Sequence, residues 1–221
     1  MPRFSFLFFI MLFLLSCNEE AKKQPPVPTS SHNPGELNTA LDAALKNYYA
    51  LTDAFVNWDS TAVPSRAAAL YAGLQAVPLQ QIAQTERETA GGSIQQAMRE
   101  IKEMQAANSL QDKRYKLNAL TQNLFDFLRA VQYDEEKMYL QQCPMAFNDT
   151  EPGIWLSKTD SILNPYLGLH HPRYGKGMLS CGENKSVIDF SSKRIETNFS
   201  SQRVETKGDN KVSDDEKKQT K

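Results

Sequence analysis

Residues 36–57 read ELNTALDAALKNYYALTDAFVN, and this stretch decides the fold class. Its large apolar side chains recur at steps of three and four residues, which places them on one face of an α-helix. They are Leu37, Leu41, Leu45, Tyr48, Leu51 and Phe55. A helix of this length extends about 33 Å, and we expect its apolar face to pack against further helices.

Two downstream stretches repeat the amphipathic pattern. Asp59 and Ser60 are suitable N-cap residues for a second helix, which ends at Pro78. A third helical region spans residues 79–107. It contains Gly91-Gly92, where we expect a break or kink because glycine weakens a helix interior.

A fourth helix begins at Ser109-Leu110-Gln111-Asp112, which resembles a capping box, and ends near Gln132. Four amphipathic helices with short links predict a mainly α fold, an antiparallel four-helix bundle. The apolar stripes indicate core packing, because they lack the inward Glu and Glu-x-x-His set of a di-metal bundle site.

The N-terminus has the features of a lipoprotein signal. Arg3 precedes an apolar run that is too short to span a bilayer but suits a signal peptide. Leu14-Leu15-Ser16-Cys17 resembles a bacterial lipobox, which implies lipidation of Cys17 and anchoring to the outer membrane, on its periplasmic face or at the cell surface. The expected divisions are a signal peptide (1–16), a tether (17–35), a helical domain with a C-terminal cap (36–184) and a disordered polar tail (185–221).

The segment between Cys143 and Cys181 follows the helices and concentrates the reactive side chains. Its composition predicts an irregular, loop-rich cap with at most a short strand near residues 137–143. With Cys17 assigned to lipid, the other two cysteines form an even pair, which is a disulfide candidate in an oxidising compartment. Such a bridge would close a loop of about 39 residues and contribute roughly 4 kcal/mol.

The same segment is also a candidate site for a soft metal ion. Copper(I) prefers thiolate, thioether and imidazole ligands, and the segment offers them in Cys143, Met145, Met178, Cys181, His170 and His171. A disulfide and a metal site compete for the same two sulfur atoms. In the disulfide alternative, the cap is packed by Trp155, Asn164, Pro165 and Tyr166.

Four separated blocks of the cap follow one another in a recognisable order. They are Cys143-Pro144-Met145-Ala146, Trp155-Leu156-Ser157, Asn164-Pro165-Tyr166 and Met178-Leu179-Ser180-Cys181-Gly182. Together with residues 49–55 and Asp59, they resemble the family known as domain of unknown function 3347, over about residues 40–185. Many members carry a His-Phe pair where this chain has Lys116-Leu117.

The resemblance implies a cellular setting. Members are mostly small secreted lipoproteins of Bacteroidetes, and similar domains are fused to adaptor subunits of heavy-metal efflux pumps that export copper or silver. It therefore implies binding of copper or another soft metal, or support of metal efflux. The residues leave open a non-catalytic interaction or scaffold module whose cap is stapled by a Cys143–Cys181 disulfide.

Composition and missing motifs argue against other function classes. The chain has 25 Lys and Arg against 26 Asp and Glu, so no basic excess favours nucleic acid as a partner. The sequence contains no G-x-S-x-G, no Gly-rich phosphate loop and no H-E-x-x-H. We therefore do not expect an enzyme, and the only membrane contact expected is the lipid on Cys17.

Overall fold

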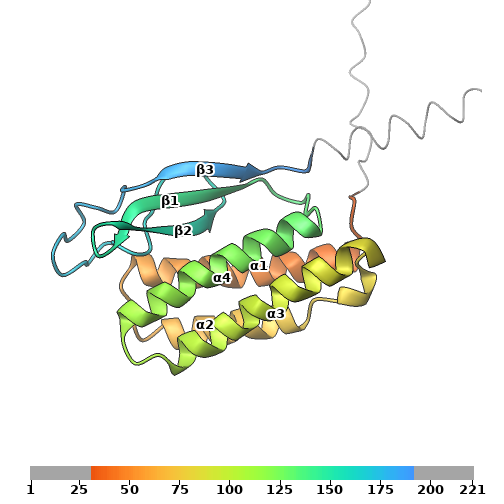
Figure 1. The fold of residues 1–221 in the computed structure, drawn as a ribbon, viewed down its shortest axis with the longest axis horizontal. Helices are drawn as coiled ribbons and strands as arrows, with labels where there is room; N and C mark the ends of the chain where they lie inside the picture. Colours follow the sequence, from red (N-terminus) through yellow and green to blue (C-terminus); the bar gives the residue numbers. More distant parts are fainter. Residues whose placement is uncertain (1–30, 192–221) are drawn as a thin grey trace, which may run out of the picture.

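A computed structural model describes residues 31–191 (Figure 1). The helices in this range are α1 (Gly35–Val56), α2 (Val63–Gln75), η1 (Leu79–Gln81, a 3-10 helix), α3 (Gln84–Ala106) and α4 (Leu110–Ala130). The strands are β1 (Met138–Phe147), β2 (Glu151–Ser157) and β3 (Glu183–Ile188). The fold is mainly helical, as predicted. The expected signal peptide, the lipidated Cys17 and most of the expected tail lie outside the described residues.

The apolar spacing predicted where the helices form. The whole stripe of α1 is buried, and Ser109 caps α4 by accepting a hydrogen bond from the Asp112 amide. α2 begins later than its predicted caps, because Asp59 instead accepts bonds from the amides of Thr61 and Ala62 in the preceding turn. None of the helices between residues 31 and 191 is long and apolar enough to span a membrane.

The break expected at Gly91-Gly92 is absent, and α3 runs through both residues. A Cβ at either glycine would meet nothing within 4 Å, so both face open space and neither is needed for close packing. Each glycine costs the helix about 1 kcal/mol. Burial of Ala90 and Ile94 on the core side of the same turns offsets this cost and keeps the helix continuous.

The cap contains a three-stranded antiparallel sheet, which corrects the prediction of at most one short strand, and residues 158–182 form an irregular loop, as predicted. The strand order is β2-β1-β3, with β1 in the centre. The sequence did not reveal β2, because Pro152 and Gly153 are typical of turns, nor β3, which is polar. β3 also crosses the expected boundary between cap and tail at residue 184.

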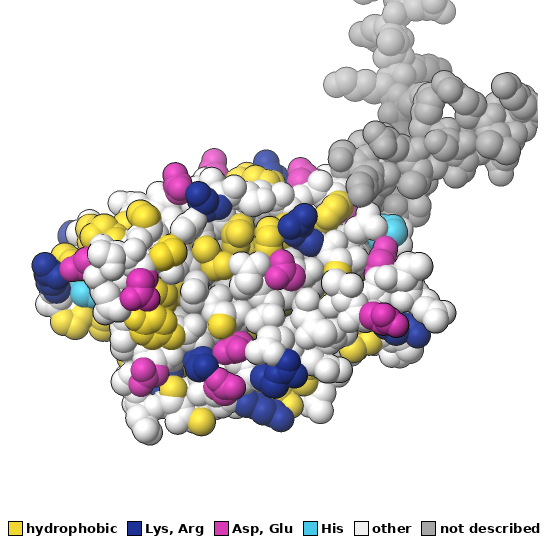
Figure 2. Space-filling model, in the orientation of Figure 1, with side chains coloured by type: hydrophobic (Ala, Val, Ile, Leu, Met, Phe, Trp, Pro, Cys, Tyr) yellow, Lys and Arg dark blue, Asp and Glu magenta, His cyan; other side chains and the backbone are white. Residues whose placement is uncertain are grey.

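The sheet lies over α1 and α4, and α2 and α3 lie on the far side of these two helices (Figure 1). β2 packs along α4 and also contacts α1, and Phe147 at the end of β1 stacks on Tyr115 of α4. Met138, Leu140 and Leu156 join the apolar side chains of the helices in one core. On the face shown in Figure 2, positive and negative side chains are interspersed and the exposed apolar surface is divided into patches.

Candidate functional site

The two cysteines that bracket the cap meet in the structure. Cys143 lies on β1 opposite Gly153 of β2, and Cys181 lies just before β3. Their Sγ atoms are 2.6 Å apart, although 38 positions separate them in the sequence. A disulfide bond is about 2.05 Å long, whereas two thiolates on one tetrahedral ion with 2.3 Å bonds would lie roughly 3.8 Å apart. The observed separation equals neither value, and it places two free thiols within reach of both arrangements.

The two thiols differ in their surroundings. Cys143 is fully buried in the central strand, and Cys181 is partly exposed. Burial, together with the neighbouring Cys143 thiol, raises the pKa of Cys181 to about 12. The thiolate is the form that binds metals, so a metal ion would have to displace a proton here, and its affinity would rise with pH.

Asn164 fixes the backbone around Cys181. Its Nδ2 donates to the Cys181 carbonyl at 2.8 Å, and its own amide donates to the Leu179 carbonyl at 2.8 Å. Its Oδ1 accepts from the amides of Tyr166 and Leu167. Because one buried side chain both donates and accepts, an asparagine is required here, and an aspartate could not replace it.

Aromatic side chains pack closely beside the thiol pair. The rings of Trp155 and Tyr166 are buried, with centroids 6.0 Å apart in an edge-to-face arrangement. Gly182 has a φ of +146°, and a Cβ there would lie 2.9 Å from Trp155 Cη2 and 2.9 Å from the Gln142 carbonyl oxygen. Only glycine fits directly after Cys181, because this approach leaves no space for a side chain.

The two methionines of the candidate metal site lie in the same segments as the thiols. Met145 is two positions after Cys143 on β1, and the amide of Cys181 donates to the Met178 carbonyl at 3.0 Å. Both methionine side chains are partly buried against the core. The segments that bring the thiols together therefore also bring two thioethers to this part of the cap.

His171 belongs to a turn of its own. Its Nδ1 accepts hydrogen bonds from the amides of Arg173 and Tyr174, and its ring stacks on Tyr174 with centroids 4.9 Å apart. Burial lowers the pKa of His171, and the Arg114 charge lowers it further. An accepting Nδ1 leaves the proton on Nε2 of a neutral imidazole, so in this conformation neither nitrogen has a free lone pair for a metal.

His170, next to it, is exposed. Within residues 31–191, no three His, Cys, Asp or Glu side chains are grouped as they would be around a metal ion. The structure thus brings the two thiols together. The ring of His171, in contrast, packs against the rings of Tyr174 and Trp58. The full ligand set remains a prediction.

The sequence did not indicate a second centre, formed by the buried Arg114 and the partly buried Trp58. Arg114 is 1% exposed, and its guanidinium carbon lies 3.9 Å from the centroid of the Trp58 ring. Its Nε donates to the Pro165 carbonyl at 3.2 Å. No ion pair within the described residues includes Arg114, and burial lowers its pKa to about 10. Arg114 therefore joins α4 to the cap by cation–π and carbonyl contacts.

Trp58 ends α1 in a conformation that usually selects glycine. Its φ is +56°, and the Asp59 amide donates to the Ala54 carbonyl at 2.9 Å, which closes the helix end. The chain of the cap then packs against this end, because the Leu169 amide donates to the Val56 carbonyl at 2.7 Å. Bulky residues are rare in this conformation, so the sequence carried no signal for it.

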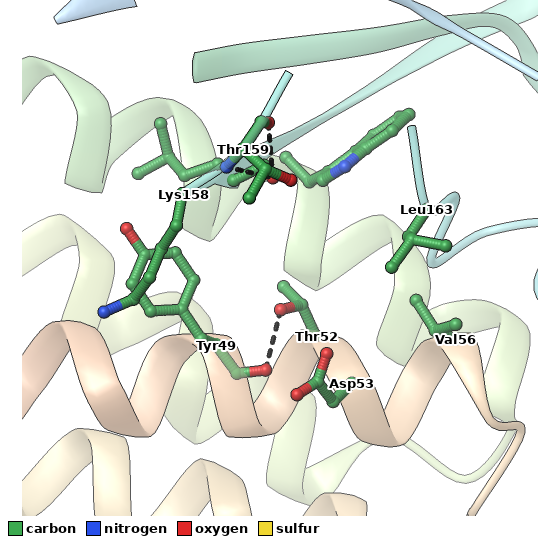
Figure 3. Close-up of a pocket in the computed structure, with 10 residues that line it drawn as sticks. Tyr49, Thr52, Asp53, Val56, Lys158, Thr159 and Leu163 are labelled. Atoms are coloured by element: carbon green, nitrogen blue, oxygen red, sulfur yellow. Dashed lines mark hydrogen bonds between the residues drawn. The ribbon is translucent and has the colours of Figure 1, made fainter. Parts of the chain in front are cut away.

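A pocket of about 210 Å³ opens between α1 and the segment after β2 (Figure 3). At one end Val56 and Leu163 approach each other, and at the other Lys158 lies over the ring of Tyr49 with its Nζ 4.7 Å from the centroid. Burial raises the pKa of Asp53, which also lines the pocket. Trp155 also lines this pocket, and the same side chain packs next to Gly182, directly after Cys181. The pocket and the thiol pair therefore share one side chain.

Part of the chain matches a known protein family. Residues 44–136 match the family described as Protein of unknown function (DUF3347), which confirms the predicted family for this part of the chain. The match covers most of α1 and all of α2, α3 and α4, and it ends before Cys143, so the four cap blocks lie beyond it. No curated protein and no solved structure matches the chain.

Proposed function

We propose that this chain is a lipid-anchored protein of the cell envelope that binds copper or another soft metal ion through Cys143 and Cys181, or supports metal efflux. The observation that supports it is the meeting of these two thiols across 38 positions of sequence. Copper(I) is a soft ion that favours thiolate and thioether ligands. Met145 and Met178 would complete the ligand set, with His170 as an outer candidate and His171 as another only if it leaves the turn in which its Nδ1 accepts two amides.

Metal binding requires a small movement of the thiols. With bonds of about 2.3 Å, the sulfur atoms have to separate from 2.6 Å to at least roughly 3.8 Å. Cys143 is fixed in the central strand, whereas Cys181 follows a turn and is partly exposed. We therefore assign the movement, and the entry of the metal, to Cys181.

The rest of the molecule would support this site. In the proposal, the four helices form an antiparallel bundle that acts as a non-catalytic scaffold, and the lipid on Cys17 attaches it to the outer membrane. The partners would be metal-efflux components, and nucleic acid is not among them. The similar chemistry of copper(I) and silver(I) makes both suitable probes.

A second candidate function is a non-catalytic interaction or scaffold module whose cap is stapled by a Cys143–Cys181 disulfide. The meeting of the two sulfur atoms supports this function as well, because a disulfide also requires them to be adjacent. In that case Cys181 would be fixed, and the surfaces of the cap would carry the interaction.

One experiment distinguishes the two functions. In the Cys17→Ser chain only Cys143 and Cys181 remain, so free thiols are counted and copper(I) is titrated before and after reduction. The metal proposal predicts one tightly bound ion in the reduced chain, loss of binding in Cys143→Ser, and about tenfold weaker binding in Met178→Leu. Met98→Leu is the matched control, because Met98 is also partly buried but lies on α3.

The opposite outcome is equally clear. If the purified chain has no free thiols and the reduced chain still binds no copper(I), metal binding is wrong and the stapled module remains. If the thiols are free and the reduced chain binds copper(I) with the predicted dependence on Cys143, the stapled module is wrong.

A further inference from the structure

The chain contains a tandem repeat of nine residues directly after β3. Residues 190–198 read FSSKRIETN, and residues 199–207 read FSSQRVETK. Six of the nine positions are identical, and a seventh exchanges isoleucine for valine. Two adjacent copies of one short pattern indicate a recognition sequence that is present twice, and not merely a polar composition.

The first repeat begins at a groove on the helical side of the molecule. Ile188 is buried at the end of β3, and Phe190 is partly buried against the core. Asp189 Oδ1 accepts a hydrogen bond from the Ser191 amide at 3.2 Å and another from its hydroxyl at 2.5 Å. This local turn orders Phe190 and Ser191, the first two residues of the repeat.

The Phe190 ring lies at the side of this groove, an open hollow of about 680 Å³ between α3 and α4, as the anchor of the first repeat. Glu86, Thr89 and Ser93 line it from α3, and Asp126, Arg129 and Ala130 line it from α4. The spacing of three and four residues on α3 places its three side chains on one face of the helix. The groove therefore continues along both helices beyond the phenyl ring.

The chemistry of the groove complements that of the repeat. Each repeat carries an arginine at its fifth position and a glutamate at its seventh, namely Arg194 with Glu196 and Arg203 with Glu205. The groove offers carboxylates at Glu86 and Asp126 and a guanidinium at Arg129. The arginine of a repeat can pair with a groove carboxylate while its glutamate pairs with the groove guanidinium. This pairing favours one orientation of a bound segment over the reverse one.

We propose that this groove binds the nonapeptide repeat, and that the second repeat of one copy of the chain, residues 199–207, docks in the groove of a second copy. The first repeat is tethered to its own groove through Phe190, so it competes locally at high effective concentration. The second repeat has the same anchor and the same charges, and exchange between two copies gives a reciprocal, closed dimer. The inference is independent of the state of Cys143 and Cys181.

The first test uses a fluorescent peptide with the sequence FSSQRVETK, titrated into the full chain in detergent. We expect saturable binding that weakens at least tenfold when the peptide's phenylalanine is replaced by alanine. In the full chain, Phe190→Ala should tighten peptide binding several-fold, because the competing first repeat loses its anchor. Thr89→Arg, on an exposed position of α3, should block the groove without disturbing the core.

Val187→Ala is the control, because Val187 is close in sequence and 45% exposed but does not line the groove. Thermal unfolding of each variant separates loss of the groove from loss of the fold. The groove assignment is overturned if the peptide binds neither the wild-type chain nor Phe190→Ala, or if it binds Thr89→Arg as tightly as the wild type.

The second test addresses the partner. Chemical cross-linking and sedimentation of the full chain in detergent should give a concentration-dependent dimer, and Phe199→Ala should shift it toward monomer with an unchanged unfolding midpoint. If the wild-type chain and Phe190→Ala are both monomeric at all concentrations, the second copy is not the occupant and the proposal is overturned.

Discussion

β2 and β3 flank the same central strand, but the backbone groups on their outer edges differ in their hydrogen-bond partners. Along β2, the outward amides of Ile154 and Leu156 donate to Asn118 Oδ1 at 2.8 Å and to the Tyr48 hydroxyl at 3.0 Å. Along β3, the residues before Ile188 are exposed, and no backbone hydrogen bond to a partner other than β1 is found within residues 31–191.

The difference shows that two strands of one sheet can be coupled to the helices to different degrees. The β2 edge is part of a hydrogen-bond relay in which the Leu156 amide donates to Tyr48, whose hydroxyl donates to Thr121 at 2.7 Å. Thr121 in turn donates to the Leu117 carbonyl at 2.9 Å. The relay joins β2, α1 and α4, so β2 is expected to unfold with the helices, whereas the backbone of β3 is paired with β1 alone within residues 31–191.

The largest expected effect comes from filling the space beside β2. A Cβ on Gly153 would lie 2.7 Å from the Ala146 Cβ and 2.8 Å from the Tyr166 ring. We expect Gly153→Val to reduce the free energy of unfolding by about 3 kcal/mol, the upper part of the range for overpacking, as measured by urea denaturation. Gly91→Ala is the control and should stabilise the chain by up to about 1 kcal/mol. A Gly153→Val chain as stable as the wild type would show that the β2 contacts are not tight.

The second prediction concerns alkaline pH. Burial raises the pKa of Tyr48 from 10.0 to about 12. The unfolded chain releases this proton at a lower pH than the folded chain. The contribution of Tyr48 to the free energy of unfolding is therefore fully present below pH 10, and it falls by about 1.4 kcal/mol per pH unit as the pH rises toward 12. Urea denaturation at several pH values should show a slope that is shallower by this amount in Tyr48→Phe. An identical slope in the two chains would mean that Tyr48 is not buried.

The third prediction removes the relay at neutral pH. Tyr48→Phe keeps the ring but leaves the buried Leu156 amide without its acceptor and Thr121 without its donor. We expect a loss of about 2 kcal/mol, because buried groups left unpaired cost about 1–3 kcal/mol. Amide hydrogen exchange at Leu156 should be faster in Tyr48→Phe than in the wild-type chain. Unchanged exchange would indicate that another group seals this edge.

The helices could be predicted from the sequence because their information is local. The stripe from Leu37 to Phe55 states the period of α1 directly, and Tyr48 was placed on the buried face. What the stripe could not state is that the Tyr48 hydroxyl meets an amide 108 positions away. The meeting of Cys143 with Cys181 was predictable for a different reason, because assigning Cys17 to lipid left a pair.

The strands could not be predicted because their information is not local. Pro152 and Gly153 resemble a turn, and only the contact of Gly153 with Tyr166 shows why glycine stands in a strand. Arg114 reads as a polar helix residue, and its burial depends on Trp58, which is distant in sequence. Whether the thiols hold a metal or each other depends on redox state and on small movements, neither of which the residue pattern specifies.

The fourth prediction weakens the same edge by a smaller amount. Asn118→Ala removes the acceptor of the partly buried Ile154 amide, and we expect a loss of about 1 kcal/mol. Asn118→Asp keeps an oxygen acceptor and should restore most of this stability, as measured by urea denaturation of both variants. If Asn118→Asp is as unstable as Asn118→Ala, the hydrogen bond to β2 is not what stabilises this position.

The smallest effect is expected on β3. Val187 is 45% exposed, and threonine has a similar shape and strand preference, so Val187→Thr should change the free energy of unfolding by less than about 0.5 kcal/mol. Amide exchange along β3 should also be faster than along β2 in the wild-type chain, because its outer edge has no partner among the described residues. A cost as large as that of Asn118→Ala would mean that chain beyond Ser191 covers the β3 edge, and the contrast between the two edges would then disappear.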